Sequence, residues 1–192
     1  MTRLPDIVFI DFEASSLDKK SYPIEVGWAF STGGEESYLI RPAPEWTDWS
    51  AEAEATHHIT REKLTAEGTP HDEVAKRMLE VLSGHALFAT APSWDGQWLS
   101  KLLRGSGLPR HALRLQDTDV AHESAIKSIL QRAHMPESEL AERTKIILAD
   151  ARLKDDEEGD PAHRALADAK RELRLWRDVQ NRAEEYVRGL RV

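Results

Sequence analysis

The sequence contains no cysteine, which excludes disulfide bonds, thiolate zinc sites and cysteine nucleophiles together. Neither of the glycine-rich phosphate-loop patterns, GxGxxG and GxxxxGK[ST], occurs. Eight histidines are present, but none falls in the HExxH pattern of zinc proteases. These absences narrow the chemistry of any site without indicating a cellular compartment.

Long hydrophobic runs and an excess of positive charge are also lacking. No stretch approaches the ~18 to 20 uninterrupted apolar residues of a membrane helix, and the opening MTRLPDIVF lacks the apolar segment of a signal peptide. We therefore expect a cytoplasmic protein with no membrane partner. The net charge of -8 argues against a protein that coats nucleic acid through a broad basic face. It is compatible with a small acidic site that reaches nucleic acid through metal ions.

The residues that are present describe one globular domain. The chain has 192 residues, 40% apolar and 31% charged, and no repeat or low-complexity linker divides it, so we expect a single domain over residues 1–192. Hydrophobic periodicity predicts strands and helices in the order β-β-β-α-β-α-β followed by helices. The expected strands begin at Ile7 and span 24–31, 37–42, 86–91 and 113–118; the expected helices span 69–84, 93–104, 119–134, 137–151 and 162–188.

This order predicts an α/β fold with a mixed five-stranded sheet and helices on both faces. The first three strands would form an antiparallel meander, and the later strands would pair in parallel. We expect residues 43–68 to be irregular or short-helical, and Thr69 to cap a helix with Pro70 at its first position and Asp72 reaching back. The acidic run KDDEEGDP, residues 154–161, is expected to be a solvated surface loop.

The first strand carries two acids where a core strand should be apolar. In IVFIDFEASSL, residues 7–17, Asp11 and Glu13 interrupt the hydrophobic run. Because side chains alternate along a strand, both acids point to one face and Phe12 points to the other. Burying carboxylates without partners is costly, so we expect a positive group beside them, either Arg or Lys or a divalent cation.

Three further residues later in the chain, Asp95, His163 and Asp168, are also candidates for a polar site next to hydrophobic segments. Asp95 follows a predicted strand in the first turn of a helix, where capping alone would account for it. Asp168 lies beside the hydrophobic stripe of the last helix, and His163 is five residues earlier, about 140° around an ideal helix. The two would meet best if His163 lay in the entry turn or the preceding loop. Taken alone, His163 is an ordinary surface or capping residue.

Taken together, these segments resemble the DEDD family of 3′-to-5′ exonucleases, the DnaQ-like group whose last motif carries His. The matching motifs are FIDFEASSL with Asp11 and Glu13, SWDGQWL with Asp95, and HRALADA with His163 and Asp168. PIEVGWAF, HHIT (57–60) and QDT (116–118) also look like family segments. The resemblance spans roughly residues 6–176, nearly the whole chain.

The resemblance implies a ribonuclease H-like fold and a metal-dependent 3′-to-5′ exonuclease. Such an enzyme would release nucleoside 5′-monophosphates from a single strand with a free 3′ end. The acids that would hold two Mg²⁺ or Mn²⁺ ions are Asp11, Glu13, Asp95 and Asp168. His163 would take the proton of the attacking water, because an imidazole can accept a proton near neutral pH.

The resemblance also implies where the substrate end would bind. The backbone of Ala14, Ser15, Ser16 and Leu17 would hold the terminal nucleotide, with Leu17 wedged against its base and His58 stacked on it. The family often has Thr and Gly at the positions of Ser15 and Ser16, and Gly at the position of His58. For Leu17 an ordinary core leucine is the alternative.

Other interpretations stay open at this stage. A non-catalytic nucleic-acid-binding or partner-binding module could keep the same scaffold. A small-molecule phosphatase or a structural protein could carry the acids as solvated groups. The sequence does not decide between DNA and RNA. The oligomeric state is also open, a homodimer included, although we expect the six tryptophans in the core or in pockets rather than at an interface.

Overall fold

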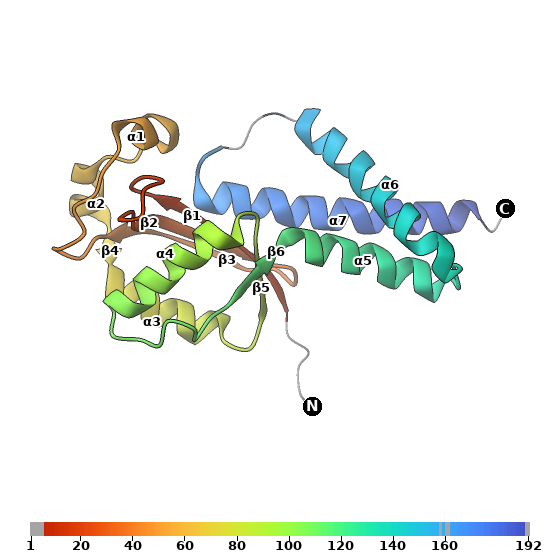
Figure 1. Cartoon of the computed structure of the whole chain (residues 1–192), viewed down its shortest axis with the longest axis horizontal. Helices are drawn as coiled ribbons and strands as arrows, with labels where there is room; N and C mark the ends of the chain where they lie inside the picture. Colours follow the sequence, from red (N-terminus) through yellow and green to blue (C-terminus); the bar gives the residue numbers. More distant parts are fainter. Residues whose placement is uncertain (1–5, 158, 160–161, 191–192) are drawn as a thin grey trace.

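A central sheet organises the computed structural model, which describes residues 6–157, 159 and 162–190 (Figure 1). Its strands are β1 (Ile7–Ala14), β2 (Pro23–Phe30), β3 (Glu35–Arg41), β4 (Thr69–Pro70), β5 (Ala86–Ala89) and β6 (Leu115–Asp117). They lie in the order β4-β3-β2-β1-β5-β6. β1 and β3 pair antiparallel with β2, whereas β5 pairs parallel with β1 and β6 with β5. The expected antiparallel meander followed by parallel strands is confirmed.

The sheet has six strands in place of the expected five. Thr69 and Pro70 form the short β4, which pairs parallel with the end of β3 at the edge of the sheet. Because the backbone of Thr69 is extended in this pairing, it does not cap α3 (His71–Leu82); the N-cap is Pro70, which makes no side-chain cap bond. Asp72 does not reach back either, because its carboxylate accepts a hydrogen bond from Lys76 at 2.8 Å. The expected Thr69 cap was therefore wrong.

Helices cover both faces of the sheet, as expected (Figure 1). α3 and α4 pack on one face, α5 and α7 pack on the other, and α6 packs against α5 and α7. The short α1 and α2 occupy the segment expected to be irregular or short-helical. Besides α3, the helices are α1 (Ala51–His57), α2 (Arg61–Glu67), α4 (Pro92–Gly105), α5 (Thr118–Arg132), α6 (Glu137–Glu157) and α7 (Ala165–Gly189). None of the described helices combines the length and apolar character that crossing a membrane requires.

The acidic run 154–161 is not a loop over its first half. α6 continues through Glu157, and residues 158, 160 and 161 lie outside the described part of the chain. The physical reason is an ion pair between Asp155 and Arg171 of α7, with 2.7 Å between Oδ2 and Nε. This pair holds the last turn of α6 against α7, a contact that the local charge pattern does not reveal.

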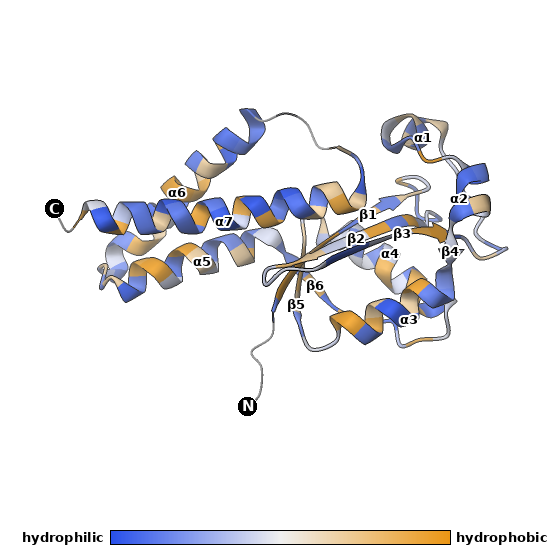
Figure 2. Ribbon diagram, turned by 180° about the vertical axis from the view of Figure 1, so that it is seen from behind, coloured by the Kyte–Doolittle hydropathy of each residue, from blue (hydrophilic) through white to orange (hydrophobic). Residues whose placement is uncertain are grey.

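Alternation along β1 assigns its side chains to two different layers. Ile10 and Phe12 are buried in the cluster that contains Leu99 of α4, whereas Phe9 packs on the opposite face with Leu173 of α7. Full burial of each such side chain contributes about 1.5–3 kcal/mol, so a one-residue slip of the register is strongly disfavoured. Figure 2 shows the resulting hydrophobic strands and the hydrophobic stripes of the helices that cover them. The odd-numbered residues of β1, including both acids, face α7.

The six tryptophans lie in or against hydrophobic clusters, as expected. Trp28, Trp46 and Trp98 are buried in the core between the sheet and α3 and α4. Trp49 and Trp94 pack against the same cluster, and Trp176 of α7 packs on the other face of the sheet. These side chains therefore contribute to the cores on both faces of the sheet.

Candidate functional site

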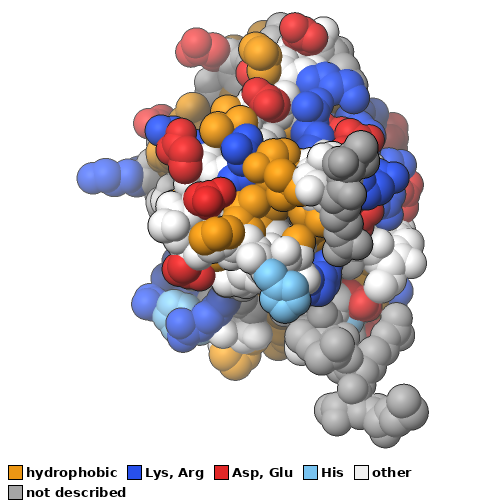
Figure 3. Space-filling view, turned by 90° about the vertical axis from the view of Figure 1, so that its right-hand side faces the viewer, with side chains coloured by type: hydrophobic (Ala, Val, Ile, Leu, Met, Phe, Trp, Pro, Cys, Tyr) orange, Lys and Arg blue, Asp and Glu red, His pale blue; other side chains and the backbone are white. Residues whose placement is uncertain are grey.

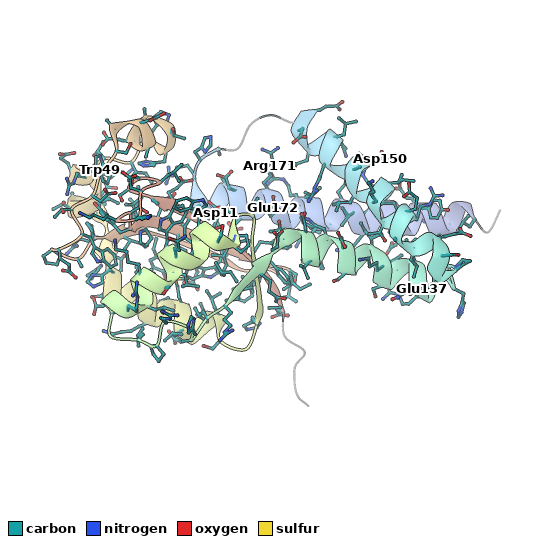
Figure 4. All side chains as sticks on the ribbon, viewed as in Figure 1. Asp11, Trp49, Glu137, Asp150, Arg171 and Glu172 are labelled. Carbon is teal, nitrogen blue, oxygen red and sulfur yellow. The ribbon has the colours of Figure 1, made fainter. Side chains whose placement is uncertain are left out.

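Three carboxylates from two elements converge near the end of β1. Asp11 and Glu13 of β1 and Asp168 of α7 each offer one oxygen, and these oxygens lie within 4.8 Å of one another. Figure 4 shows Asp11 at the junction between the sheet and α7. Like charges this close repel one another, whereas oxygen ligands at this spacing suit a divalent cation.

The described basic side chains near this group are engaged with other acids. Among the described residues, ion pairs to lysine or arginine are absent from all four candidate acids, Asp11, Glu13, Asp95 and Asp168. Arg164 and Arg171 lie close by, but Glu25 holds the first at 2.6 Å and Asp155 holds the second at 2.7 Å. The sequence analysis expected either a basic side chain or a divalent cation beside Asp11 and Glu13. The arrangement of the described residues therefore favours the divalent cation.

Burial and mutual repulsion raise the pKa values of the clustered acids. Burial, followed by the charges of Asp95 and Glu13, raises the pKa of Asp11 well above its usual range. Burial and the charges of Asp168 and Glu25 raise the pKa of Glu13 to about 7. Burial also raises the pKa of Asp95 to about 7, although backbone N–H groups donate to its carboxylate. Near neutral pH the cluster is therefore poised to take up protons or a cation.

Asp95 reaches the site from the first turn of α4. It is 2% exposed, and its Oδ2 accepts a hydrogen bond from the backbone N–H of Ala91 at 3.2 Å, so it also caps the helix. It lines a cavity of about 800 Å³ together with Asp11, Asp168 and His163. Nine described acids and two arginines line this hollow, which we call the acidic cavity. Asp95 therefore both caps α4 and lines the acidic cavity, although the sequence analysis treated these two roles as alternatives.

A tight turn before α7 brings His163 to the acidic cavity. His163 is exposed, lies two residues before the helix and has a left-handed backbone with φ of 49°. Asp168 holds this turn, because its Oδ1 accepts from the N–H of Ala162 at 3.0 Å and its Oδ2 from the N–H of Arg164 at 3.1 Å. A carboxylate has about four acceptor sites, so Asp168 can hold the turn and still offer an oxygen to a cation. This geometry accounts for the five-residue spacing.

Glu25, which the sequence analysis did not single out, fixes the start of α7. This residue of β2 is 3% exposed, and its carboxylate accepts from the backbone N–H of Ala165 at 3.0 Å and from the Arg164 guanidinium at 2.6 Å. Arg164, the N-cap residue, makes no side-chain cap bond, so Glu25 caps the helix from the neighbouring strand. The signal was a single acid inside the apolar run PIEVGWAF.

Gly27 of β2 allows α7 to approach the sheet closely. Gly27 pairs with Asp11 across the antiparallel register. A Cβ at this position would lie 2.3 Å from the backbone nitrogen of Leu166 and 2.7 Å from the carbonyl carbon of Ala165. The first turn of α7 therefore rests directly on β2, which sets the separation between Asp168 and the acids of β1.

Gly27→Ala should displace the first turn of α7. We expect a loss of about 1–3 kcal/mol of stability, because the added methyl meets backbone atoms that cannot rotate away. The melting temperature should fall by about 2 to 4 °C for each kcal/mol, and the stabilisation by Mn²⁺ should weaken because Asp168 moves. Gly189→Ala is the control, since among the described residues no atom beyond the glycine's chain neighbours and its own helix backbone lies within 4 Å of its added Cβ. Equal melting temperatures for both variants and the wild type would contradict the close approach.

Glu172 is a further acid of the cavity that sequence analysis missed. It lies one helical turn after Asp168 on α7 and lines the acidic cavity, near Asp11 in Figure 4. Burial raises the pKa of Glu172, and its Oε2 is 3.6 Å from Nε2 of the buried His122. The i, i+4 spacing from Asp168, which puts both acids on one helix face, is the signal that could have found it.

The segment after β1 borders a second hollow of about 540 Å³, which we call the side pocket. Ala14, Ser16 and Leu17 line it, and it shares Glu13 and His163 with the acidic cavity. Leu17 is 71% exposed, so the alternative of a core leucine is excluded. The side pocket therefore continues the acidic cavity along the segment that was expected to hold a substrate end.

The two serines of this segment are tied into the protein. Ser15 is buried and does not line the side pocket; its N–H donates to the carbonyl of Tyr22 at 3.0 Å. The hydroxyls of Ser15 and Ser16 donate to Asp48 at 3.2 and 2.6 Å. The backbone N–H groups of Ser16 and Leu17 make no hydrogen bond to any described residue. Among the described residues, these two amides are therefore free to bind a ligand.

The structure brings His57, rather than His58, to the side pocket. α1 ends at His57, and His58 adopts the left-handed C-cap conformation with φ of 57°. His58 is exposed and does not line the pocket, whereas the buried His57 does. The Nδ1 of His57 accepts from the N–H of Ile59 at 3.0 Å, and its Nε2 has no partner among described residues. The expected contact of His58 is corrected accordingly, because the helix end decides which of two adjacent histidines turns inward.

The raised pKa of Glu13 predicts a pH-dependent effect of Glu13→Gln in the metal-free protein. Between about pH 4.5 and 7 the folded state keeps the proton that the unfolded state loses, so the wild type loses stability as pH rises to about 7. Gln is neutral throughout. At pH 8 the variant should therefore melt about 2 to 4 °C above the wild type, which corresponds to ~1 kcal/mol of unfolding free energy. At pH 4.5 the variant and the wild type should melt at the same temperature. A constant difference across this range, measured in EDTA, would refute the buried charge.

No family model matches this sequence, and no curated protein matches it significantly. Solved structures do match. The zinc-bound form of E. coli exonuclease I in complex with single-stranded DNA superposes with a TM-score of 0.65 at 16% identity, covering 96% of this chain and 43% of that chain. E. coli exonuclease I with a dA16 oligonucleotide gives 0.53 at 15% identity, covering 64% and 30%. Exonuclease I from Methylocaldum szegediense gives 0.54 at 17% identity, covering 69% and 30%.

At these low identities the superpositions show a shared fold alone. The expected ribonuclease H-like α/β class is thereby confirmed, with a mixed sheet and helices on both faces. The chain spans less than half the length of each of these exonuclease I structures.

Proposed function

We propose that this chain is a metal-dependent 3′-to-5′ exonuclease. It hydrolyses phosphodiester bonds at the free 3′ end of single-stranded DNA or RNA and releases nucleoside 5′-monophosphates, with residues 1–192 acting as a single exonuclease domain. The observation that carries the proposal is the convergence of Asp11, Glu13 and Asp168 without a basic partner. The fold shared with exonuclease I, which was solved with single-stranded DNA, supports it.

The donor set fits Mg²⁺ or Mn²⁺. Carboxylate oxygens are the ligands that these hard cations favour. In this proposal Asp11, Glu13, Asp95 and Asp168 would hold the two ions, directly or through water. When bound, the two cations would supply an activated water and would stabilise negative charge on the departing oxygen.

His163 is the proposed general base. It lines the acidic cavity, is exposed and makes no side-chain hydrogen bond to any described residue, so a ring nitrogen is available to accept the proton of the attacking water. Asp168 orients it by holding the amides on either side of it. Glu25 orients it more remotely through Arg164.

The side pocket is the proposed place of the terminal nucleotide. The amides of Ser16 and Leu17 would bind the 3′ end, beside Ala14, while Ser15 supports this segment through Asp48. Leu17 would wedge against the final base. The stacking contact first expected of His58 is assigned to the neighbouring histidine that lines the pocket. Because such a pocket needs an unpaired end, a duplex would first have to fray.

Leu17→Ala should weaken binding of the terminal nucleotide without unfolding the protein. Since Leu17 is 71% exposed, its melting temperature and its stabilisation by Mn²⁺ should match the wild type. KM for a single strand should rise about tenfold, which corresponds to ~1.4 kcal/mol of lost contact. Leu153→Ala, at a leucine of α6 that is 64% exposed, is the control. The wedge is ruled out when both variants keep the same KM.

The function is tested with 5′-labelled DNA and RNA oligonucleotides in Mg²⁺ and in Mn²⁺. We expect ladders that shorten from the 3′ end, faster cutting of a single strand than of a blunt duplex, and slower cutting of a 3′-phosphorylated strand. Mononucleotides released from a circular strand, or shortening from the 5′ end, would defeat the proposal. Strand binding without turnover would favour a non-catalytic binding module.

A further inference from the structure

A groove rich in basic side chains adjoins the acidic cavity. It measures about 510 Å³ and lies along α4 and residues 110–115. Among the described residues no acid lines it, whereas the basic side chains that do are Lys19, Lys101, Arg104, Arg110, His111 and Arg114. We call it the basic groove.

The exposed cations of this groove are not neutralised by acids of the described residues, although Arg104 donates to the carbonyl of Ser100 and Arg110 to the ring of His111. Elsewhere, Arg77 and Arg164 each pair with a glutamate. Within the described ranges, no ion pair is formed by the exposed groove cations Lys19, Arg104, Arg110 and Arg114. Side chains of one sign gathered in a hollow repel one another and raise the local concentration of the opposite charge. The groove is therefore suited to an anionic ligand from outside the chain.

The charge of the groove runs against the composition of the chain. The sequence has 34 acids among 192 residues, so about three would be expected among the groove's 16 lining residues, and none is there. At the opposite end, formed by α5, α6 and α7, acidic and basic side chains are interspersed around hydrophobic ones (Figure 3). The separation of charge is thus a local feature beside the acidic cavity.

The three hollows meet at Trp98, which lines the basic groove, the acidic cavity and the side pocket. They are also adjacent along the chain, because Ala91 lines the acidic cavity and Pro92 lines the groove. A strand with its 3′ nucleotide in the side pocket and a phosphodiester at the acids would therefore continue into the groove.

We propose that the basic groove binds the phosphodiester backbone of the strand on the 5′ side of the cleaved nucleotide. This inference rests on the proposed exonuclease function. Lys and Arg neutralise phosphates, and contacts to phosphate carry no sequence information. The groove thus gives affinity for long single strands of any sequence, in a protein whose net charge opposes such binding.

The test compares Arg110→Gln/Arg114→Gln with the control Arg132→Gln/Lys145→Gln, whose exposed cations lie on α5 and α6. Binding of a labelled single strand of about 16 nucleotides is measured by fluorescence anisotropy from about 50 to 200 mM NaCl with Mn²⁺. Both pairs are placed in the Asp11→Asn background so that the strand stays intact. Hydrolysis of the same strand and of a dinucleotide is measured with Asp11 in place, and thermal melting checks the fold of each variant.

The groove variant should bind the strand about tenfold more weakly than the control, and the slope of log Kd against log salt should fall by about 1.4, or ~0.7 for each lost contact. Its preference for the long strand over the dinucleotide, as a ratio of kcat/KM, should fall about tenfold. Equal binding and equal slopes for both variants would overturn the proposal. The proposal would also be overturned if poly-glutamate bound the wild type as tightly as the single strand does and the groove variant lost this binding. The groove would then fit an acidic protein.

The two proposals fail in different ways. Weaker strand binding by the groove variant, in a protein whose wild type hydrolyses neither substrate, would support the groove and defeat only the exonuclease activity. Hydrolysis of both substrates with no preference for the longer one, and no effect of the groove variant, would support the activity and overturn the groove.

Discussion

Asp11→Asn should lower hydrolysis of a single strand by at least roughly 10² to 10³-fold while the protein stays folded. Asp11 is the acid that its neighbours affect most broadly, because its pKa rises with the charges of Asp95, Glu13, Asp168 and Glu172 as well as with burial. A ligand in the middle of such a group is the one that two cations would share. Asn keeps the shape of the side chain but removes the charge, so both cations should be lost together.

The same variant makes a second, opposite prediction for stability. Without metal, the buried charge at Asp11 is unfavourable, so Asp11→Asn should melt at or above the wild type in EDTA. With Mn²⁺ the wild type should gain stability and the variant should not. Asp150→Asn, at an exposed acid of α6, is the control and should behave as the wild type in both assays. If Asp11→Asn and Asp168→Asn both kept near wild-type hydrolysis, the shared-metal site would be wrong.

Replacement of His163 should separate proton transfer from metal binding. We expect His163→Asn to lower the rate by about 10² to 10⁴-fold, typical of a lost general base, with the gain in melting temperature from Mn²⁺ retained. Asn is chosen because it tolerates the left-handed backbone at this position, where φ is 49°.

A matched control exists at His134, which also has a positive φ, of 60°, and is exposed beyond the end of α5. His134→Asn should leave rate, pH profile and Mn²⁺ response unchanged. If His163→Asn lost metal stabilisation in proportion to rate, His163 would be a ligand or a structural residue, and the proton acceptor would have to be sought elsewhere in the acidic cavity.

The local hydrophobic pattern of the sequence determined most helices and strands, and it determined to which side of the sheet each side chain of β1 points. The alternation of hydrophobic residues around Asp11 and Glu13 was enough to place both acids on one face and Phe12 on the other, because burial penalises any other register. The turn before α7 was foreseeable only in part. Residues five apart are separated by about 140° on a helix, so His163 would meet Asp168 best from an entry turn, but the expected helix began at residue 162 and α7 begins at Ala165. Period and spacing are properties of short segments, so a single sequence contains them.

The tertiary structure alone decided which distant groups meet. Glu25 caps α7 by accepting from the N–H of Ala165, which is 140 residues away in the chain, and Gly27 admits Leu166 at a similar separation. The two-residue β4, the extension of α6 against Arg171 and the choice of His57 over His58 depend likewise on partners that no local period encodes. The basic groove is the same kind of feature, because its cations are scattered over residues 19–114 and gather only when α4 packs on the sheet. Such contacts follow from the packing of whole elements, whose free energies are shared among many residues and leave no signature at any one of them.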